Sequence, residues 1–168
     1  GFVQTQEGSG CYGNPSVPEL VKEFYKQVSI VKDATTAFKT GGVHAMHDPT
    51  EGGVAGGIHE MADASGLGFK IFEEKIPLAK ETLEMCRFFT IDPLCLIASG
   101  SLLIAADKHS TDKIIEALAK KEITANIIGE FLPNPEKRLM KRKDGSTSEL
   151  TRPVSDHLWL ALEKPVAN

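Results

Sequence analysis

The sequence predicts an α+β domain in which helices pack on a mixed sheet, and two observations support this. Helical and strand-like patterns follow one another along the chain, but without the strict alternation of a purely parallel, doubly wound sheet. Towards the end of the chain, Asp144-Gly145 stands between two strand-like runs. This dipeptide is typical of a two-residue hairpin turn between antiparallel strands.

The first elements follow from glycine, proline and hydrophobic spacing. Glycines crowd the N-terminal stretch and no periodic pattern is visible there, which indicates a loop. Further on, Thr50 can cap a helix in which Val54, Ile58 and Met61 recur at helical spacing. In chain order we expect a loop over residues 1–17, helices over 18–28 and 30–39, a strand over 43–46 and a helix over 50–64.

The remaining elements alternate between short apolar runs and amphipathic stretches. A short, strongly apolar run suits a central strand, and apolar residues three or four positions apart suit a helix. We expect strands over residues 67–72, 101–106 and 125–131, helices over 77–89, 111–120 and 155–162, one further turn over 94–98, and hairpin strands over 138–143 and 146–150. Leu158, Trp159 and Leu162 are expected to pack the last helix into the core.

Composition limits the class of protein. With 168 residues, 41% hydrophobic and 25% charged, the chain has the length and composition of one globular domain. We divide it into residues 1–17, a linker or tag-derived tail, and residues 18–168, the domain. The net charge of −4 argues against a nucleic-acid partner, and no apolar run has membrane-spanning length. The three cysteines form no CxxC pair, so we expect the reducing cytoplasm.

The chemistry of a candidate site depends on the strand-loop-helix at residues 43–64. The expected strand delivers Asp48, and glycine pairs follow at Gly52-Gly53 and Gly56-Gly57. Unpaired N–H groups at a helix start attract anions, and glycines there allow a phosphate to approach the backbone. A nearby carboxylate could hold Mg²⁺. The alternative is a plain helix cap whose glycines permit tight helix packing.

The stretch HAMHDPTEGGVAGGIHEMADASGLGFKI closely resembles the C-terminal domain of proteins related to aminoimidazole ribonucleotide (AIR) synthase. Two later stretches, IDPLCLIASGSLLIA and ANIIGEF, resemble the same family in the same order. The resemblance extends from about Glu19 to about Glu163. It is closest to the hydrogenase expression/formation proteins of the HypE type and their archaeal relatives.

The resemblance implies a three-layer α/β/α arrangement with a mixed sheet and a part in ATP-dependent chemistry. It implies that the protein's own N-terminal domain supplies most ATP and Mg²⁺ ligands and forms a homodimer, while this domain closes the nucleotide cleft. Transferred to this sequence, Asp48 and Thr50 are the candidate catalytic residues. Asp48 would bind the metal, and Thr50, Gly52 and Gly53 would bind the cofactor. Alone, the domain would be an inactive fragment of a ligase, kinase or dehydratase-type enzyme.

Two departures from the HypE type keep a second interpretation open. Glu51 stands where that type has arginine, and the chain ends Lys164-Pro165-Val166-Ala167-Asn168 without that type's terminal cysteine. An anion in place of a cation disfavours phosphate unless Mg²⁺ intervenes. The alternative is therefore a non-catalytic interaction domain that retains the fold.

Other conspicuous residues have structural explanations. We interpret His44, His47 and His59 as hydrogen-bonded histidines rather than metal ligands. Cys86 and Cys95 lie in apolar surroundings and are interpreted as core thiols. The basic run at residues 137–143 is interpreted as a solvated sheet edge.

Overall fold

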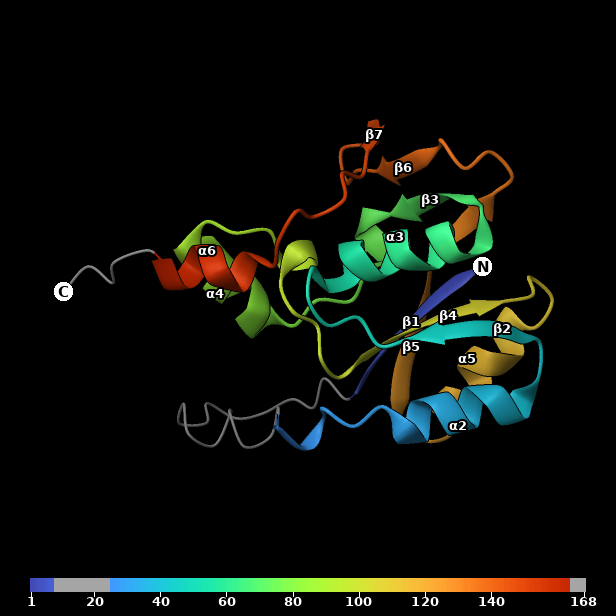
Figure 1. Ribbon diagram of the computed structural model, residues 1–168. Coiled ribbons are helices and arrows are strands. Elements are labelled where there is room, and N and C mark those ends of the chain that lie inside the picture. The colour runs from blue at the N-terminus through green and yellow to red at the C-terminus, as the bar shows by residue number, and fades with distance from the viewer. Residues whose placement is uncertain (8–24, 164–168) are drawn as a thin grey trace.

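The computed structural model describes residues 1–7 and 25–163. These form an α+β domain built on one sheet of mixed direction (Figure 1). The elements in chain order are β1 (Phe2–Glu7), α2 (Val31–Thr40), β2 (Val43–His47), α3 (Gly53–Ser65), β3 (Gly68–Phe72), η1 (Glu73–Lys75), α4 (Lys80–Phe89), η2 (Pro93–Cys95), β4 (Ser101–Ala106), α5 (Thr111–Ala119), β5 (Ile123–Leu132), β6 (Arg138–Lys141), β7 (Thr147–Glu149) and α6 (His157–Glu163).

The sheet has the strand order β2-β4-β1-β5-β3-β6-β7. Only the pair β3–β6 is parallel among the described strands, and every other neighbouring pair is antiparallel. The sheet therefore contains both parallel and antiparallel pairs, and the predicted mixed sheet is confirmed.

The N-terminal strand β1 corrects the prediction of a loop over residues 1–17. It lies inside the sheet, where Val3 pairs with Ile104 of β4 and with Ile127 of β5. A strand covered on both faces does not show an apolar–polar alternation, and polar Gln4 and Thr5 are buried in it. The loop prediction is therefore wrong for residues 2–7. Residues 8–17, and residues 18–24 of the expected helix, lie outside the described part of the chain.

Helices cover the two faces of the sheet, as expected for three layers. In Figure 1, α3 lies on one side of the β1, β4 and β2 strands, and α2 and α5 lie on the other. On the α3 side, Ile58 packs with Phe2 and Leu103. On the other side, Ala37 of α2 and Ile114 of α5 pack with Val3.

The elements α4 and α6 lie beyond one end of the sheet (Figure 1). The helix expected over residues 77–89 is present from Lys80 to Phe89, and its inner side is formed by buried Cys86 and half-buried Leu83 and Phe89. For α6 the prediction is wrong at two of its three positions. Leu158 is half-buried, but Trp159 is 50% exposed and Leu162 is 67% exposed, so these two do not pack into the core. No described helix has the length and apolarity to cross a bilayer.

The hairpin β6–β7 exists, but its loop is longer than predicted. Arg142 N–H donates to the Ser146 carbonyl, and Gly145 N–H donates to the Arg142 carbonyl. Asp144-Gly145 therefore belongs to a three-residue loop, in which Gly145 adopts the positive φ of +87°.

Candidate functional site at the start of helix α3

The loop between β2 and α3 turns sharply because two consecutive glycines adopt positive φ angles. Gly52, the N-cap residue of α3, has φ +77°, and Gly53 has φ +61°. The prediction that Thr50 caps this helix is wrong, since the cap is Gly52 and no side chain on the loop caps the helix. Thr50 contributes its carbonyl, which accepts Gly53 N–H at 3.0 Å.

The anion-binding position at the start of α3 holds a carboxylate of the chain itself. Asp156, which is 4% exposed, accepts the Gly52 N–H through Oδ2 at 2.8 Å. Its other oxygen accepts Leu158 N–H at 2.8 Å, at the start of α6. One carboxylate therefore joins the C-terminal segment to the first turn of α3. A phosphate can reach the Gly52 amide only in place of Asp156.

Contacts within the protein explain the glycines of α3. A Cβ at Gly53 would lie 2.3 Å from the carbonyl oxygen of Leu96 and 2.6 Å from that of Leu94. A Cβ at Gly57 would lie 3.0 Å from both Leu103 Cδ1 and Pro49 Cβ. Tight packing, the alternative explanation of these glycines, accounts for both positions. It also fixes the β2–α3 loop firmly against its surroundings.

Asp48 and Thr50 lie at the surface of this loop. The side chain of Asp48 is 68% exposed, and His47 Nδ1 lies 4.0 Å from its Oδ1. Thr50 and Glu51 are also exposed. Among the described residues, no group of three metal-ligating side chains comes together. Asp48 can therefore offer Mg²⁺ one carboxylate, and the other oxygens have to come from phosphate, water or another domain.

His44, His47 and His59 have protein partners, as interpreted from the sequence. His44 Nε2 lies 2.8 Å from Asp107 Oδ1, and His47 Nε2 lies 2.5 Å from Glu60 Oε2 on α3. His59 is buried, and its Nε2–H donates to the Leu150 carbonyl at 2.8 Å. Burial is the main cause that lowers the pKa of His59, so its ring is held neutral.

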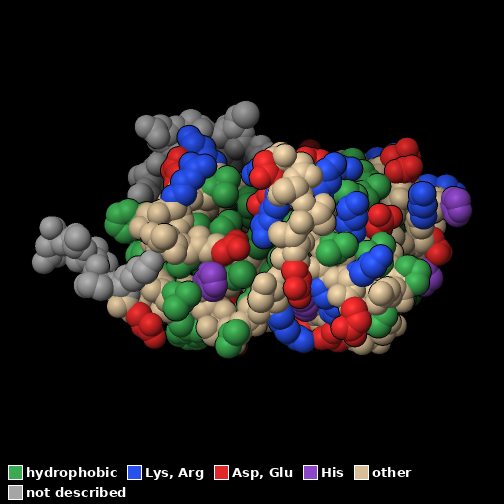
Figure 2. Space-filling view, turned by 90° about the horizontal axis from the view of Figure 1, so that it is seen from above, with side chains coloured by type: hydrophobic (Ala, Val, Ile, Leu, Met, Phe, Trp, Pro, Cys, Tyr) green, Lys and Arg blue, Asp and Glu red, His purple; other side chains and the backbone are tan. Residues whose placement is uncertain are grey.

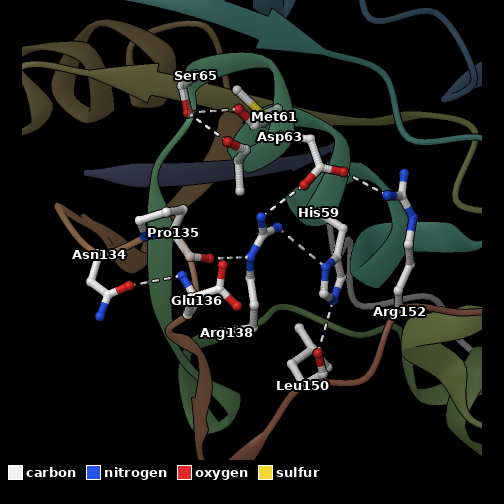
Figure 3. A network of polar contacts seen from close by, with 11 residues as sticks. His59, Met61, Asp63, Ser65, Asn134, Pro135, Glu136, Arg138, Leu150 and Arg152 are labelled. Carbon is white, nitrogen blue, oxygen red and sulfur yellow. Dashed lines mark hydrogen bonds and ion pairs between the residues drawn. The ribbon is translucent and has the colours of Figure 1, made fainter.

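A polar network beside His59 attaches the β6–β7 hairpin to α3 (Figure 3). Asp63 of α3 receives Arg138 Nη2–H at 2.8 Å on one oxygen and Arg152 Nη1–H on the other. These arginines hold the pKa of the Asp63 carboxyl below its usual value. Arg138 also lies over the Phe69 ring, 5.6 Å from its centroid. Arg138 and Arg152 thus have a structural role, because they attach the C-terminal part of the chain to α3.

Cys86 and Cys95, the cysteines in the described part of the chain, are unsuited to nucleophilic chemistry. Burial, followed by the charges of Asp92 and Asp156, raises the pKa of Cys95 to about 11. Burial also raises the pKa of Cys86. Both remain thiols at neutral pH, which agrees with their interpretation as core residues.

Asp156 is the residue that sequence reasoning missed. Ser155-Asp156 before an apolar stretch is a cap signal for α6, and the structure bears out that local role. The signal carries no information on the Gly52 amide, which is 104 residues away.

Fold and site together define a mixed-sheet α/β/α domain with a glycine-rich strand-to-helix loop. The family model of the C-terminal domain of AIR synthase related proteins matches residues 3–142, so this chain belongs to that family.

Curated relatives agree with this assignment. The hydrogenase expression/formation protein MJ0676 of Methanocaldococcus jannaschii is 37% identical over 89 residues, which cover 52% of this chain and 27% of that protein. Carbamoyl dehydratase HypE of Rhizobium leguminosarum bv. viciae is 38% identical over 102 residues, which cover 60% of this chain and 28% of that protein.

Solved structures share the fold. The crystal structure of E. coli HypE superposes with a TM-score of 0.72 at 22% identity, covering 95% of this chain and 52% of that one. A HypE crystallised in complex with ATP gives a TM-score of 0.65 at 18% identity, covering 90% of this chain and 50% of that one. The chain therefore spans about half the length of these HypE chains.

Proposed function

We propose that this domain is the C-terminal half of an ATP-dependent enzyme of the hydrogenase-maturation type. In this proposal an N-terminal domain binds most of the nucleotide, and the β2–α3 loop closes the cleft over its phosphates. Asp48 provides a carboxylate oxygen to Mg²⁺, and the Thr50 hydroxyl donates to a phosphate oxygen. Gly52 and Gly53 shape the loop and bring its amides towards the phosphates.

The exposure of Asp48 carries this proposal. A rigid loop, fixed by two positive-φ glycines and a buried proline, presents a carboxylate that is 68% exposed. Such a group keeps its hydration until a cation binds, and a fixed position reduces the ordering cost of binding. The ATP complex of a HypE with this fold supports a nucleotide as the ligand.

The proposal places conditions on Asp156. Its carboxylate already accepts the Gly52 N–H, so this amide is not free to bind phosphate. Thr50 makes the first contact with phosphate in this proposal. The Gly52 N–H can bind phosphate only when the C-terminal segment that carries Asp156 moves. Charge neutralisation by Mg²⁺ is also needed, because Glu51 adds a negative charge to the same loop.

The test uses a full-length protein that carries both domains. Asp48→Asn preserves shape and removes the charge, so we expect Mg²⁺-dependent ATP binding and turnover to fall by at least about tenfold. Glu116→Gln, an exposed change on α5 across the sheet, is the matched control. Calorimetry with Mg-ATP and a phosphate-release assay are the measurements. Unchanged turnover in Asp48→Asn would remove Asp48 from the site.

Homodimer formation through the N-terminal domain and a cytoplasmic location belong to the same proposal. We also expect the 168-residue chain by itself to show no ATP turnover, because phosphoryl chemistry depends on ligands positioned from both sides of the cleft.

A non-catalytic interaction domain is the second candidate, and the end formed by α4 and α6 favours it. Met85 and Phe88 of α4 and Trp159 of α6 are each at least half exposed. Hydrophobic side chains gather at that end in Figure 2, whereas Lys and Arg are interspersed with Asp and Glu over the rest of this face. Retained ATP binding without turnover in the full-length protein would favour this candidate.

A further inference from the structure

Helix α6 is apolar around its whole circumference. The run from Leu158 to Leu162 consists of leucine, tryptophan and alanine, and a helix of this composition is ordinarily covered on all sides. Of this run only Ala161 is buried, whereas Trp159, Leu160 and Leu162 are exposed. The described part of the chain therefore covers one side of α6 and leaves the other side to a second surface.

Helix α4 adds exposed apolar side chains at the same end of the molecule (Figure 1). Met85 and Phe88 are 57% and 70% exposed, and their spacing of three places them on one side of the helix. Asp92, which follows α4, donates its N–H to His157 Nδ1 of α6 at 3.0 Å and so joins the two elements. Tryptophan, phenylalanine and methionine are enriched at protein contact surfaces. We call the exposed side chains of Met85, Phe88, Trp159, Leu160 and Leu162 the α4–α6 surface.

The α4–α6 surface adjoins the β2–α3 loop. Asp156, directly before α6, accepts the Gly52 N–H at the start of α3. Pro153 lies against the same glycine, because a Cβ at Gly52 would lie 3.7 Å from Pro153 Cβ. Helix α3 begins at the end of the sheet nearest to α4 and α6 (Figure 1). In the proposed function this loop faces an N-terminal domain across the nucleotide cleft, so the α4–α6 surface borders the region that such a domain contacts.

We propose that the α4–α6 surface is the docking surface for the protein's own N-terminal domain, with Phe88 and Trp159 inserted into an apolar, uncharged face of that domain. The length of a similar protein supports this occupant, since the chain spans 52% of the E. coli HypE chain and the remainder of that chain has no counterpart here. The inference rests on the proposed function, which divides the enzyme between two domains.

Trp159 reports whether this surface is covered, because it is the single tryptophan of the 168-residue chain. The 168-residue chain and the full-length protein are labelled with fluorotryptophan, and Trp159→Phe identifies the Trp159 resonance by fluorine NMR. The change of its chemical shift between light and heavy water measures solvent exposure. We expect the change in the full-length protein to be less than about half of that in the 168-residue chain, because the anchors of an interface are desolvated.

Two variants assign the shielding to the α4–α6 surface. Phe88→Asp places a charge in the contact, so in the full-length protein the Trp159 shift change should return to its value in the 168-residue chain. In the 168-residue chain itself Phe88 is exposed, so the variant should keep its thermal midpoint, which separates docking from folding. Phe38→Asp is the matched control: Phe38 is 72% exposed on α2, across the sheet from α3, and its replacement should leave Trp159 shielded.

The proposal is overturned if Trp159 is equally exposed in both proteins, which would leave the surface to an external partner, or if the shielding persists in full-length Phe88→Asp. It is also overturned if Trp159 is already shielded in the 168-residue chain. Shielding that is independent of protein concentration would assign the cover to another segment of this chain, and shielding that grows with concentration would assign it to a second copy.

The failure of this inference is distinguishable from the failure of the proposed function. Unchanged ATP turnover in Asp48→Asn would remove Asp48 from the nucleotide site without altering the shielding of Trp159. An exposed Trp159 in a full-length protein whose turnover depends on Asp48 would refute the docking surface alone.

Discussion

Asp156 stabilises two helix starts with one carboxylate. It accepts the Gly52 amide of α3 and the Leu158 amide of α6, and it is almost fully buried. Asp156→Ala removes both bonds and leaves the Gly52 N–H buried without its acceptor. We expect the free energy of unfolding to fall by about 2–4 kcal/mol, measured by urea denaturation. Asp112→Ala, an exposed change on α5, should cost less than about 1 kcal/mol. Equal effects would contradict the role of Asp156.

His59 gives the domain a defined pH dependence. Burial lowers its pKa below the ordinary value of 6.5, so the unfolded chain binds a proton at a pH where the folded chain does not. This contribution to stability is complete above about pH 6.5 and is lost as the pH falls towards the folded pKa. Asp63, whose pKa is also lowered, loses its contribution only in a more acidic range.

Urea unfolding between about pH 5 and 7.5 measures this effect. His59→Gln can still donate to the Leu150 carbonyl but does not titrate, so its stability should decline less steeply on acidification. His109→Gln, an exposed histidine after β4, should retain the slope of the unmodified chain. A slope that is the same in His59→Gln and the unmodified chain would refute the assignment.

Helix α3 has a glycine with positive φ at each end, and the two positions have different surroundings. Gly53 meets the Leu94 and Leu96 carbonyls, whereas nothing lies within 4 Å of a Cβ at Gly66, the C-cap. Gly66→Ala adds only backbone strain, about 1 kcal/mol. Gly53→Ala adds a clash with fixed backbone, and we expect a loss above about 3 kcal/mol. The thermal unfolding midpoints of the two variants are compared. Similar midpoints would contradict the predicted clash at Gly53.

The sequence predicted those elements whose buried positions are apolar. Helices α2 and α5 have an apolar face that recurs at helical spacing, and β4 is a continuous apolar run that is buried from Leu102 to Ala106. The β1 strand was missed because its buried positions include polar Gln4 and Thr5. The place of Asp48 directly after β2 follows from the proline behind it, which favours extended geometry for the preceding residue. The bond from Asp156 to Gly52 does not follow from sequence, since it joins segments 104 residues apart.

At the level of the whole molecule, the apolar end formed by α4 and α6 differs from the rest of the surface. Large apolar patches are uncommon on isolated domains and usually mark contact surfaces. Trp159 and Leu162 were expected in the core because the periodicity of the sequence shows that one face of this helix is apolar. The periodicity does not show whether that face packs on the same domain or on another one.

The integrity of the whole domain depends on β1. This strand pairs with β4 along one edge and with β5 along the other, so it joins the β2–β4 half of the sheet to the β5–β3–β6–β7 half. Its Phe2 and Val3 belong to the two hydrophobic cores on opposite faces. A chain that begins at residue 8 therefore loses the strand that joins the two halves of the sheet, and part of both cores. We expect no cooperative thermal transition and weak near-ultraviolet circular dichroism from that chain. Phe2→Leu with Val3→Ile preserves the strand and should unfold cooperatively. A cooperative transition in the shortened chain would show that the two halves of the sheet pair without β1.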